Sequence, residues 1–171
     1  MTNGNLSAKE VSFQAGPVQL KGYLATPKGV GQFSTVIYLH GGRGTAVGGD
    51  PQATAEALAK SGFVGFAPIS GRNSSLARNI EEVIAAVDYV KNIEYVDEQR
   101  LAIVGFSRGG LLAFMASTQR RDLNAVVLMA PAHGQGTLRR FLSRADGVTA
   151  PRGQERHETG GPCKNLSLIH I

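Results

Sequence analysis

Residues 100–117 read RLAIVGFSRGGLLAFMAS, the most informative stretch of this sequence. Its first part, LAIV, is an apolar run typical of a buried β-strand, and its last part, GLLAFMAS, has the composition of a helix. Between them stands the pentapeptide Gly105-Phe106-Ser107-Arg108-Gly109. A strand, a sharp turn with a central serine and a helix, in this order, form the context that a G-x-S-x-G nucleophile elbow requires.

Ser107 is the side chain that such a turn would project. The elbow forces its serine into a strained backbone conformation that raises the hydroxyl above the sheet. Glycines are expected at both flanking positions because a Cβ there would collide with the neighbouring strand and helix. Since a helix N-terminus favours a developing negative charge, we predict that Ser107 is a catalytic nucleophile. The alternative is an ordinary strand-to-helix turn that contains a serine by chance.

A second motif, His40-Gly41-Gly42-Arg43-Gly44, follows the apolar run TVIYL at residues 35–39. Acyl transfer needs two backbone N–H donors around the oxyanion, usually the N–H after the nucleophile and one from the loop after an earlier strand. We therefore predict an oxyanion hole formed by Arg108 together with Gly42 or Arg43. His40 precedes the serine, whereas the catalytic base follows the serine in proteins with a G-x-S-x-G nucleophile elbow. We interpret His40 and Gly41 as structural parts of the motif.

The rest of the chain alternates strands and helices. Residues 11–24 predict a β-hairpin, and Asp50 followed by Pro51 marks a helix start. Apolar residues at helical spacing over 76–90 leave Glu81, Glu82 and Lys91 on the solvent side. The expected elements after the hairpin are strands at 35–39, 63–68, 100–104 and 125–129 and helices at 51–61, 76–90 and 111–118. This series predicts an α/β fold: a mostly parallel sheet with helices on both faces and an N-terminal antiparallel hairpin.

The composition describes one globular domain, with 171 residues, 42% hydrophobic and 18% charged. The net charge of +5 belongs to the C-terminal part. Residues 1–119 hold ten Lys and Arg against nine Asp and Glu, whereas residues 120–171 hold eight against four. No basic face interleaved with aromatic residues accompanies this excess, so we expect no nucleic-acid partner. The apolar runs are far shorter than the roughly 20 residues that cross a bilayer, so we expect no membrane partner either.

The remaining composition gives no sign of a disulfide framework, a metal site or a dinucleotide site. The single cysteine, Cys163, cannot form an intramolecular disulfide and fits a cytoplasmic location. No H-E-x-x-H or comparable cluster of metal ligands occurs, and the glycines near Ser107 lack the spacing of a dinucleotide fingerprint. The expected partner is an ester or amide substrate, and the oligomeric state stays open.

Three features together resemble the α/β-hydrolase superfamily: the hairpin ending in Ala25-Thr26-Pro27, the TVIYLHGGRG loop and the RLAIVGFSRGG elbow. Over residues 10–131 the chain is most similar to the dienelactone hydrolase family and its prolyl-oligopeptidase-like relatives. This resemblance implies a triad in which serine, an acid and a histidine follow in chain order, a small-molecule substrate, and no metal or organic cofactor. Dienelactone hydrolase itself uses a cysteine nucleophile, whereas position 107 is serine, which points to a general ester or amide hydrolase.

The acid and the base of such a triad are not evident. Asp122 with His133, and Asp146 with His157, have the right order, but we interpret both pairs as ordinary polar residues. His133 could line the mouth of the pocket. Each further strand-helix unit takes on the order of 30 residues, and no convincing strand follows residue 131. We therefore expect a truncated chain without its C-terminal strands, catalytic acid and base.

The composition changes after residue 142. Between residues 143 and 165 only Ala145, Val148, Ala150 and Cys163 are apolar, too few to offset the entropy of ordering. The last six residues, LSLIHI, equal one reading frame of a sequencing-library adapter. We predict a partial α/β-hydrolase domain at residues 1–142 and a polar, disordered or artefactual tail at 143–171. The strand at 125–129 would then be an exposed edge.

These observations favour a serine hydrolase that acts on an ester, lactone or amide carbonyl through an acyl-enzyme at Ser107. Two alternatives stay open. One is a non-catalytic fragment or binding module of the same fold, and the other is a serine peptidase of the prolyl-oligopeptidase type.

Overall fold

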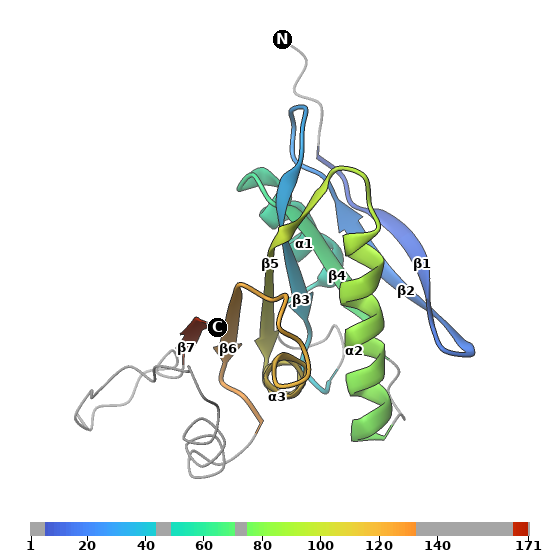
Figure 1. Ribbon diagram of the computed structural model, residues 1–171, viewed down its shortest axis with the longest axis vertical. Helices are drawn as coiled ribbons and strands as arrows, with labels where there is room; N and C mark the ends of the chain where they lie inside the picture. Colours follow the sequence, from blue (N-terminus) through green and yellow to red (C-terminus); the bar gives the residue numbers. More distant parts are fainter. Residues whose placement is uncertain (1–5, 44–48, 71–74, 133–165, 171) are drawn as a thin grey trace, which may run out of the picture.

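The computed structural model describes residues 6–43, 49–70, 75–132 and 166–170 of the 171-residue chain. Within this part, seven strands form one sheet in the order β1-β2-β4-β3-β5-β6-β7, and three helices pack on it (Figure 1). The strands are β1 (Lys9–Ala15), β2 (Val18–Ala25), β3 (Phe33–Leu39), β4 (Val64–Ile69), β5 (Val96–Phe106), β6 (Ala125–Met129) and β7 (Leu166–His170); the helices are α1 (Pro51–Lys60), α2 (Leu76–Lys91) and α3 (Arg108–Ser117). The predicted α/β class is confirmed.

The strand pairing follows the predicted architecture. β1 and β2 form an antiparallel hairpin that turns at Gly16, whose φ of 59° suits glycine. β2 pairs antiparallel with β4, and β4, β3, β5 and β6 run parallel to one another. Parallel neighbours need crossover connections, which α1, α2 and α3 supply. The carboxyl ends of β3, β5 and β6 therefore meet at one end of the sheet.

The sheet is buried on both faces. α2 and α3 pack on one face, against side chains such as Ile37, Phe66 and Ile103, and α1 packs on the other, against Tyr38 and Ala67. Successive residues of a strand point to opposite faces, so the neighbours Ile37 and Tyr38 belong to different clusters. Burial on both faces explains why the parallel strands read as continuous apolar runs.

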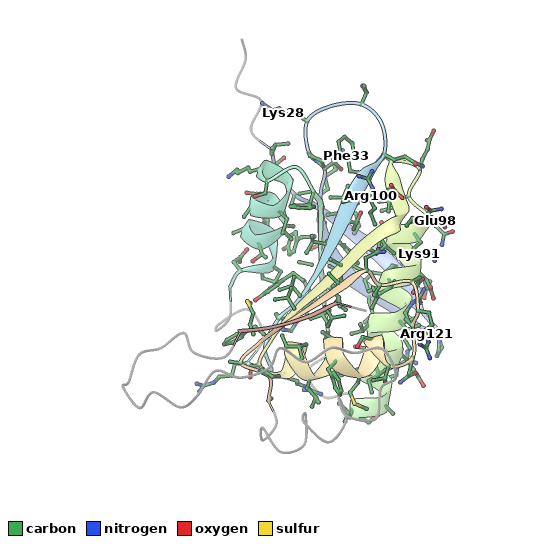
Figure 2. The ribbon with its side chains drawn as sticks, turned by 60° about the vertical axis from the view of Figure 1, so that its left-hand side comes forward. Lys28, Phe33, Lys91, Glu98, Arg100 and Arg121 are labelled. Carbon is green, nitrogen blue, oxygen red and sulfur yellow. The ribbon has the colours of Figure 1, made fainter. Side chains whose placement is uncertain are left out.

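The strand β5 begins earlier than the sequence predicted, at Val96 instead of Arg100. Residues 97–99 are polar, and Asp97 Oδ1 accepts a hydrogen bond of 2.9 Å from the backbone N–H of Gln99. The register with β3 shifts here, because Phe33 pairs with Val96 whereas Thr35 pairs with Leu101. This irregularity interrupts the apolar pattern on which the prediction rested. Figure 2 shows Phe33, Glu98 and Arg100 near the end of the sheet at which β3 and β5 begin.

The prediction that Glu82 faces solvent on α2 is wrong. Glu81 and Glu82 were both expected on the solvent side, but only Glu81, with 63% of its side chain exposed, lies there. Glu82 is 4% exposed and Asn79 is 1% exposed. Asn79 accepts a hydrogen bond from Arg108 at the start of α3, so this side of α2 is covered by the neighbouring elbow. The buried stripe of α2 is therefore wider than its apolar residues alone indicate.

The C-terminal region also differs from the prediction. No strand was expected after residue 131, yet Leu166–His170 forms β7 and pairs antiparallel with β6, from Met129 opposite Leu166 to Ala125 opposite His170 (Figure 1). The edge of β6 is therefore covered. The low apolar content that led to the prediction applies to residues 143–165, which precede this strand. The predicted boundary at residue 142 and most of the predicted tail lie outside the described residues.

Candidate active site

Ser107 lies on the turn between β5 and α3, where it is the N-cap residue of the helix. Its backbone angles are φ 52° and ψ −113°. Among the described non-glycine residues, only Ser107 and Ala130 have a positive φ. A non-glycine residue held in this region is strained, and such strain is concentrated at functional sites. Ser107 as a whole is half-buried.

The two glycines of the elbow allow backbone segments to touch. A Cβ on Gly105 would lie 2.2 Å from the carbonyl oxygen of Gly109, and a Cβ on Gly109 would lie 2.2 Å from the carbonyl oxygen of Leu39. Real Cβ atoms do not approach backbone oxygens so closely. Glycine at both positions therefore lets the start of α3 lie directly against the ends of β5 and β3.

The segment after β6 holds the elbow from the other side. The backbone N–H of Ser107 donates to the carbonyl oxygen of Met129 over 2.9 Å, and the N–H of Ala132 donates to the carbonyl oxygen of Ser107 over 2.9 Å. Ala130, with φ 43°, lies between these two bonds in the chain. The backbone of Ser107 is therefore fixed on both sides by hydrogen bonds to one neighbouring segment.

The loop after β3 lies beside the residue that follows Ser107. A Cβ on Gly42 would come within 3.3 Å of Cδ and 3.5 Å of Cβ of Arg108, so the Gly42 backbone packs on the stem of this side chain. Gly41 is buried, whereas Gly42 and Arg43 are exposed. The structure thus brings Gly42 and Arg108, two predicted contributors to an oxyanion hole, next to each other.

His40 connects this loop to β4. Its Nδ1 lies 2.8 Å from the carbonyl oxygen of Gly41, and its Nε2 accepts a hydrogen bond of 3.2 Å from the backbone N–H of Ser70. An Nε2 that accepts from an N–H leaves the ring proton on Nδ1, which donates to Gly41; this tautomer is assigned from the partners. Both ring nitrogens are thus engaged with the backbone, which supports the interpretation of His40 as a structural residue.

Known proteins share this arrangement of elements. Est1E from Butyrivibrio proteoclasticus matches with a TM-score of 0.63 at 24% identity, over 72% of this chain and 51% of that chain. A candidate dienelactone hydrolase from Klebsiella pneumoniae matches with a TM-score of 0.62 at 20% identity, over 72% of this chain and 59% of that chain. The chain has the α/β-hydrolase fold. It spans about half the length of these two solved structures.

Two comparisons of sequence agree with the fold. Residues 70–140 of this α/β-hydrolase chain match the prolyl oligopeptidase family. The uncharacterized peptidase YtmA of Bacillus subtilis (strain 168) is 24% identical over 174 residues, which cover 93% of this chain and 67% of that protein. An alignment of this extent reaches beyond residue 142, into the predicted tail. The chain is therefore related to hydrolases at low identity.

Asp122, a member of one of the two triad pairs considered above, lies before the start of β6, at the end of this strand opposite to Met129. Arg120 donates to its carboxylate twice, from Nε over 2.8 Å and from Nη2 over 2.6 Å, and Lys91 Nζ lies 2.7 Å away. The hydrogen bonds from Arg120 are the main cause that holds the pKa of Asp122 well below its usual value. Asp122 is therefore part of an ion-pair cluster away from the elbow. Its partner His133, and the pair Asp146 and His157, lie outside the described residues.

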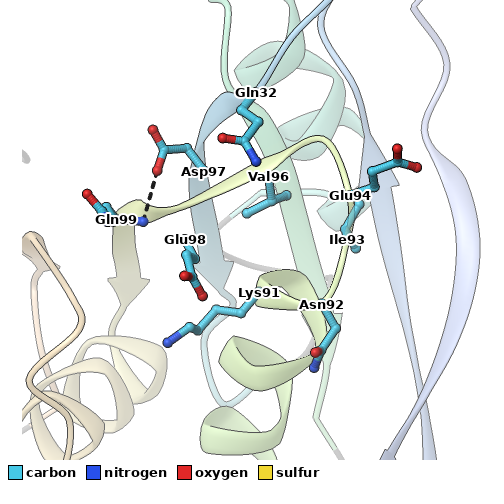
Figure 3. A pocket seen from close by; sticks show the side chains of 9 residues that line it. All are labelled: Gln32, Lys91, Asn92, Ile93, Glu94, Val96, Asp97, Glu98 and Gln99. Carbon is cyan, nitrogen blue, oxygen red and sulfur yellow. Dashed lines mark hydrogen bonds between the residues drawn. The ribbon is translucent and has the colours of Figure 1, made fainter.

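One cavity, of about 570 Å³, lies far from Ser107. It is open and polar, lies where α2 ends and β5 begins, and is lined by Gln32, Lys91, Asn92, Ile93, Glu94, Val96, Asp97, Glu98 and Gln99 (Figure 3). Because β5 runs from Val96 to Phe106, the cavity and the elbow are separated by the length of this strand, roughly 30 Å. The cavity is therefore no substrate site for Ser107.

The sequence did not indicate a role at the elbow for two buried polar residues of α2. Asn79 and Glu82 stand on α2 three residues apart, both buried, and Asn79 contacts Arg108. Their spacing on one helix face was the available signal, but glutamate and asparagine in a helix usually face solvent. In the part of the chain that the structure describes, no group of three or more His, Cys, Asp or Glu could hold a metal ion. No helix there is long and apolar enough to span a membrane.

Proposed function

We propose that this chain is a serine hydrolase that cleaves an ester, lactone or amide through an acyl-enzyme on Ser107. The observation that carries the proposal is the strained backbone of Ser107, φ 52°, at the start of α3 and beside the contact between Arg108 and Gly42. A half-buried serine at a helix N-terminus, next to a glycine loop, is the arrangement that covalent catalysis on a carbonyl requires.

In the proposed reaction, Ser107 Oγ bonds to the carbonyl carbon and the carbonyl oxygen takes the negative charge. The backbone N–H groups of Arg108 and of Gly42 or Arg43 would donate to that oxygen. Collapse of the intermediate breaks the bond to the alcohol or amine, and water then attacks the acyl-enzyme to release the acid. The serine proton must pass to a base, and His40 is not placed to receive it because both its ring nitrogens are engaged.

A serine peptidase is the second candidate. The match of residues 70–140 to the prolyl oligopeptidase family and the similarity to the peptidase YtmA favour it. The structure of Est1E with ferulic acid bound favours a small aromatic carboxylic acid ester instead. Both matches are at 24% identity, and the chain covers 67% of YtmA but 53% of Est1E, so we keep esters, lactones and amides together as proposed substrate classes.

Covalent labelling tests the proposal. The full chain is incubated with a fluorophosphonate, which forms a phosphonate ester with a reactive serine hydroxyl and releases fluoride, and the modified peptides are identified by mass spectrometry. Because the described residues place no base beside Ser107, we expect slow modification that is confined to Ser107, none at this position in Ser107→Ala, and unchanged labelling in Ser61→Ala, which removes an exposed hydroxyl at the end of α1. Labels spread over surface serines, or no label at all, would favour the non-catalytic alternative.

Ester hydrolysis tests where the base lies. The described residues offer no base beside Ser107, so we expect the chain to hydrolyse p-nitrophenyl butyrate at only a residual rate, roughly 10³- to 10⁴-fold above water. We expect His133→Ala and His157→Ala to leave this rate unchanged. A fast rate that depends on Ser107 and is lost in one of these variants would place the base within this chain.

A further inference from the structure

A buried polar chain connects α2 to the elbow. The guanidinium of Arg108 donates from Nη2 to Oδ1 of Asn79, and Nδ2 of Asn79 donates to Oε2 of Glu82 over 3.4 Å. Nε of Arg78 lies 3.9 Å from Oε1 of Glu82. Asn79 is 1% and Glu82 is 4% exposed. These four residues are called the elbow network below.

Burial makes this network costly unless its groups remain paired. A carboxylate removed from water loses several kcal/mol of hydration, which hydrogen bonds and opposite charges must offset. Apolar residues at positions 79 and 82 would avoid this cost and would continue the apolar stripe of α2. The polar groups therefore point to a requirement at Arg108, whose guanidinium Asn79 contacts from α2.

Arg108 joins the network to both halves of the proposed oxyanion hole. Its own backbone N–H is one expected donor, and the stem of its side chain packs on Gly42, within 3.3 Å of where a Cβ would stand. Asn79 holds the far end of the same side chain. A change in the rotamer of Arg108 would therefore remove the surface on which the Gly42 backbone rests.

We propose that Asn79 and Glu82 are positioning residues that hold the Arg108 side chain, and through it the loop at residues 41–43, at the distance that oxyanion binding requires. This inference rests on the proposed function. Donors that are out of place by about 1 Å can lower a rate by roughly 100-fold, so the positioning has a measurable effect. Neither residue touches the substrate in this proposal.

A purely structural role makes a different prediction. Arg78 also bonds to Oε2 of Glu81 over 3.0 Å, within α2, and to the carbonyl oxygen of Ala15 over 2.5 Å, which connects α2 to the β1–β2 hairpin. If Glu82 only supported that tie, its loss would lower stability without changing the elbow. Glu81→Gln is the matched control, because it removes the neighbouring carboxylate, which contacts the same arginine but lies in solvent.

The experiment compares Asn79→Ala, Glu82→Ala, Glu82→Gln and Glu81→Gln in the full chain. Two quantities are measured: the limiting rate of fluorophosphonate labelling at Ser107 with its half-saturating concentration, and amide hydrogen exchange in the peptide that contains residues 41–43. We expect Asn79→Ala and Glu82→Ala to lower the limiting rate roughly 10- to 100-fold at an unchanged half-saturating concentration, and to speed exchange in the loop. Glu82→Gln keeps an acceptor for Asn79 and should retain most of the rate, and Glu81→Gln should match the wild type.

The outcomes separate this inference from the proposed function. If the wild type is labelled at Ser107 but Asn79→Ala has the same rate and the same loop exchange, the positioning role is wrong. If the wild type is not labelled, the proposed function fails, while faster loop exchange in Asn79→Ala would still support the positioning. Circular dichroism verifies folding, and Asn79→Ser replaces Asn79→Ala if the alanine variant does not fold.

Discussion

The two ends of the parallel strands are built differently. At the carboxyl end, β3, β5 and β6 meet with backbone contacts that leave no room for a Cβ at Gly105 or Gly109, and Ser107 is strained. At the opposite end, the strands begin in polar loops beside an open cavity of about 570 Å³, and Val30 in the loop before β3 is fully exposed. Within the described part of the chain, backbone segments thus pack tightly around Gly105 and Gly109 at one end of the sheet, and an open cavity lies at the other.

This difference supports the elbow as the place of the proposed active site. Ligands of open α/β sheets bind beyond the carboxyl ends of the strands, and strain persists only where the surrounding structure enforces it. Both criteria select the elbow. A search by cavity volume would instead point to the end of the sheet where β5 begins. There the lining is solvated, and no strained serine lies among the described residues. Backbone geometry is therefore the better guide here.

The largest expected effect comes from adding one methyl group at the elbow. In Gly109→Ala the new Cβ would meet the carbonyl oxygens of Leu39 and His40 at 2.2 and 2.7 Å, so backbone must move. We expect a loss of about 3 kcal/mol in the free energy of unfolding, the upper end for overpacking, measured by urea denaturation.

Gly31→Ala is the matched control at the opposite end. No atom lies within 4 Å of its new Cβ, so its only cost is the positive φ of 108°, about 1–2 kcal/mol. An equal loss in both variants would mean that the two ends do not differ in packing.

An intermediate effect is expected from Asp122→Asn, which lies at the end of the sheet where the parallel strands begin. Arg120 and Lys91 both contact this carboxylate, which is 28% exposed. We expect the variant to lose about 1 kcal/mol in the free energy of unfolding at pH 7, because charge-assisted hydrogen bonds are lost in a partly solvated place.

The loss of stability in Asp122→Asn should depend on pH, and the lowered pKa of Asp122 fixes the direction of this dependence. The hydrogen bonds from Arg120 lower the pKa of Asp122 in the folded state, so its stabilisation is complete above the ordinary pKa of 3.8 and is lost as the pH falls toward the lowered value. Urea denaturation at pH 7 and pH 3 should therefore show a smaller difference between wild type and Asp122→Asn at the lower pH. A difference that grows with acid would contradict this linkage.

The sequence predicted the strained end better than its surroundings. The elbow is a short contiguous segment, with glycines at 105 and 109 around a serine. It could therefore be recognised from the local sequence, without knowledge of any tertiary contact. The burial of Asn79 and Glu82 could not be recognised in this way, because it depends on residues distant in sequence. Arg108, which contacts Asn79, lies 29 positions later and reaches α2 only in the folded chain. The strand β7 was not predicted for a related reason. Its pairing with β6 is a long-range contact, and the sequence of a five-residue segment does not reveal such a contact.

The smallest effect is expected at the cavity, from Asp97→Asn. The hydrogen bond from Arg100, and then the one from the backbone N–H of Gln99, lower the pKa of Asp97. Because solvent surrounds this pair, screening leaves it little influence on folding, and asparagine retains an acceptor for the Gln99 amide. We expect the urea midpoint at pH 7 to equal that of the wild type and to stay equal when salt is raised to 1 M. The rate of labelling at Ser107 should also be unchanged, because the whole of β5 separates the two places. If Asp97→Asn lowered the midpoint as much as Asp122→Asn, the cavity would be a constrained structure, and the contrast between the two ends would be wrong.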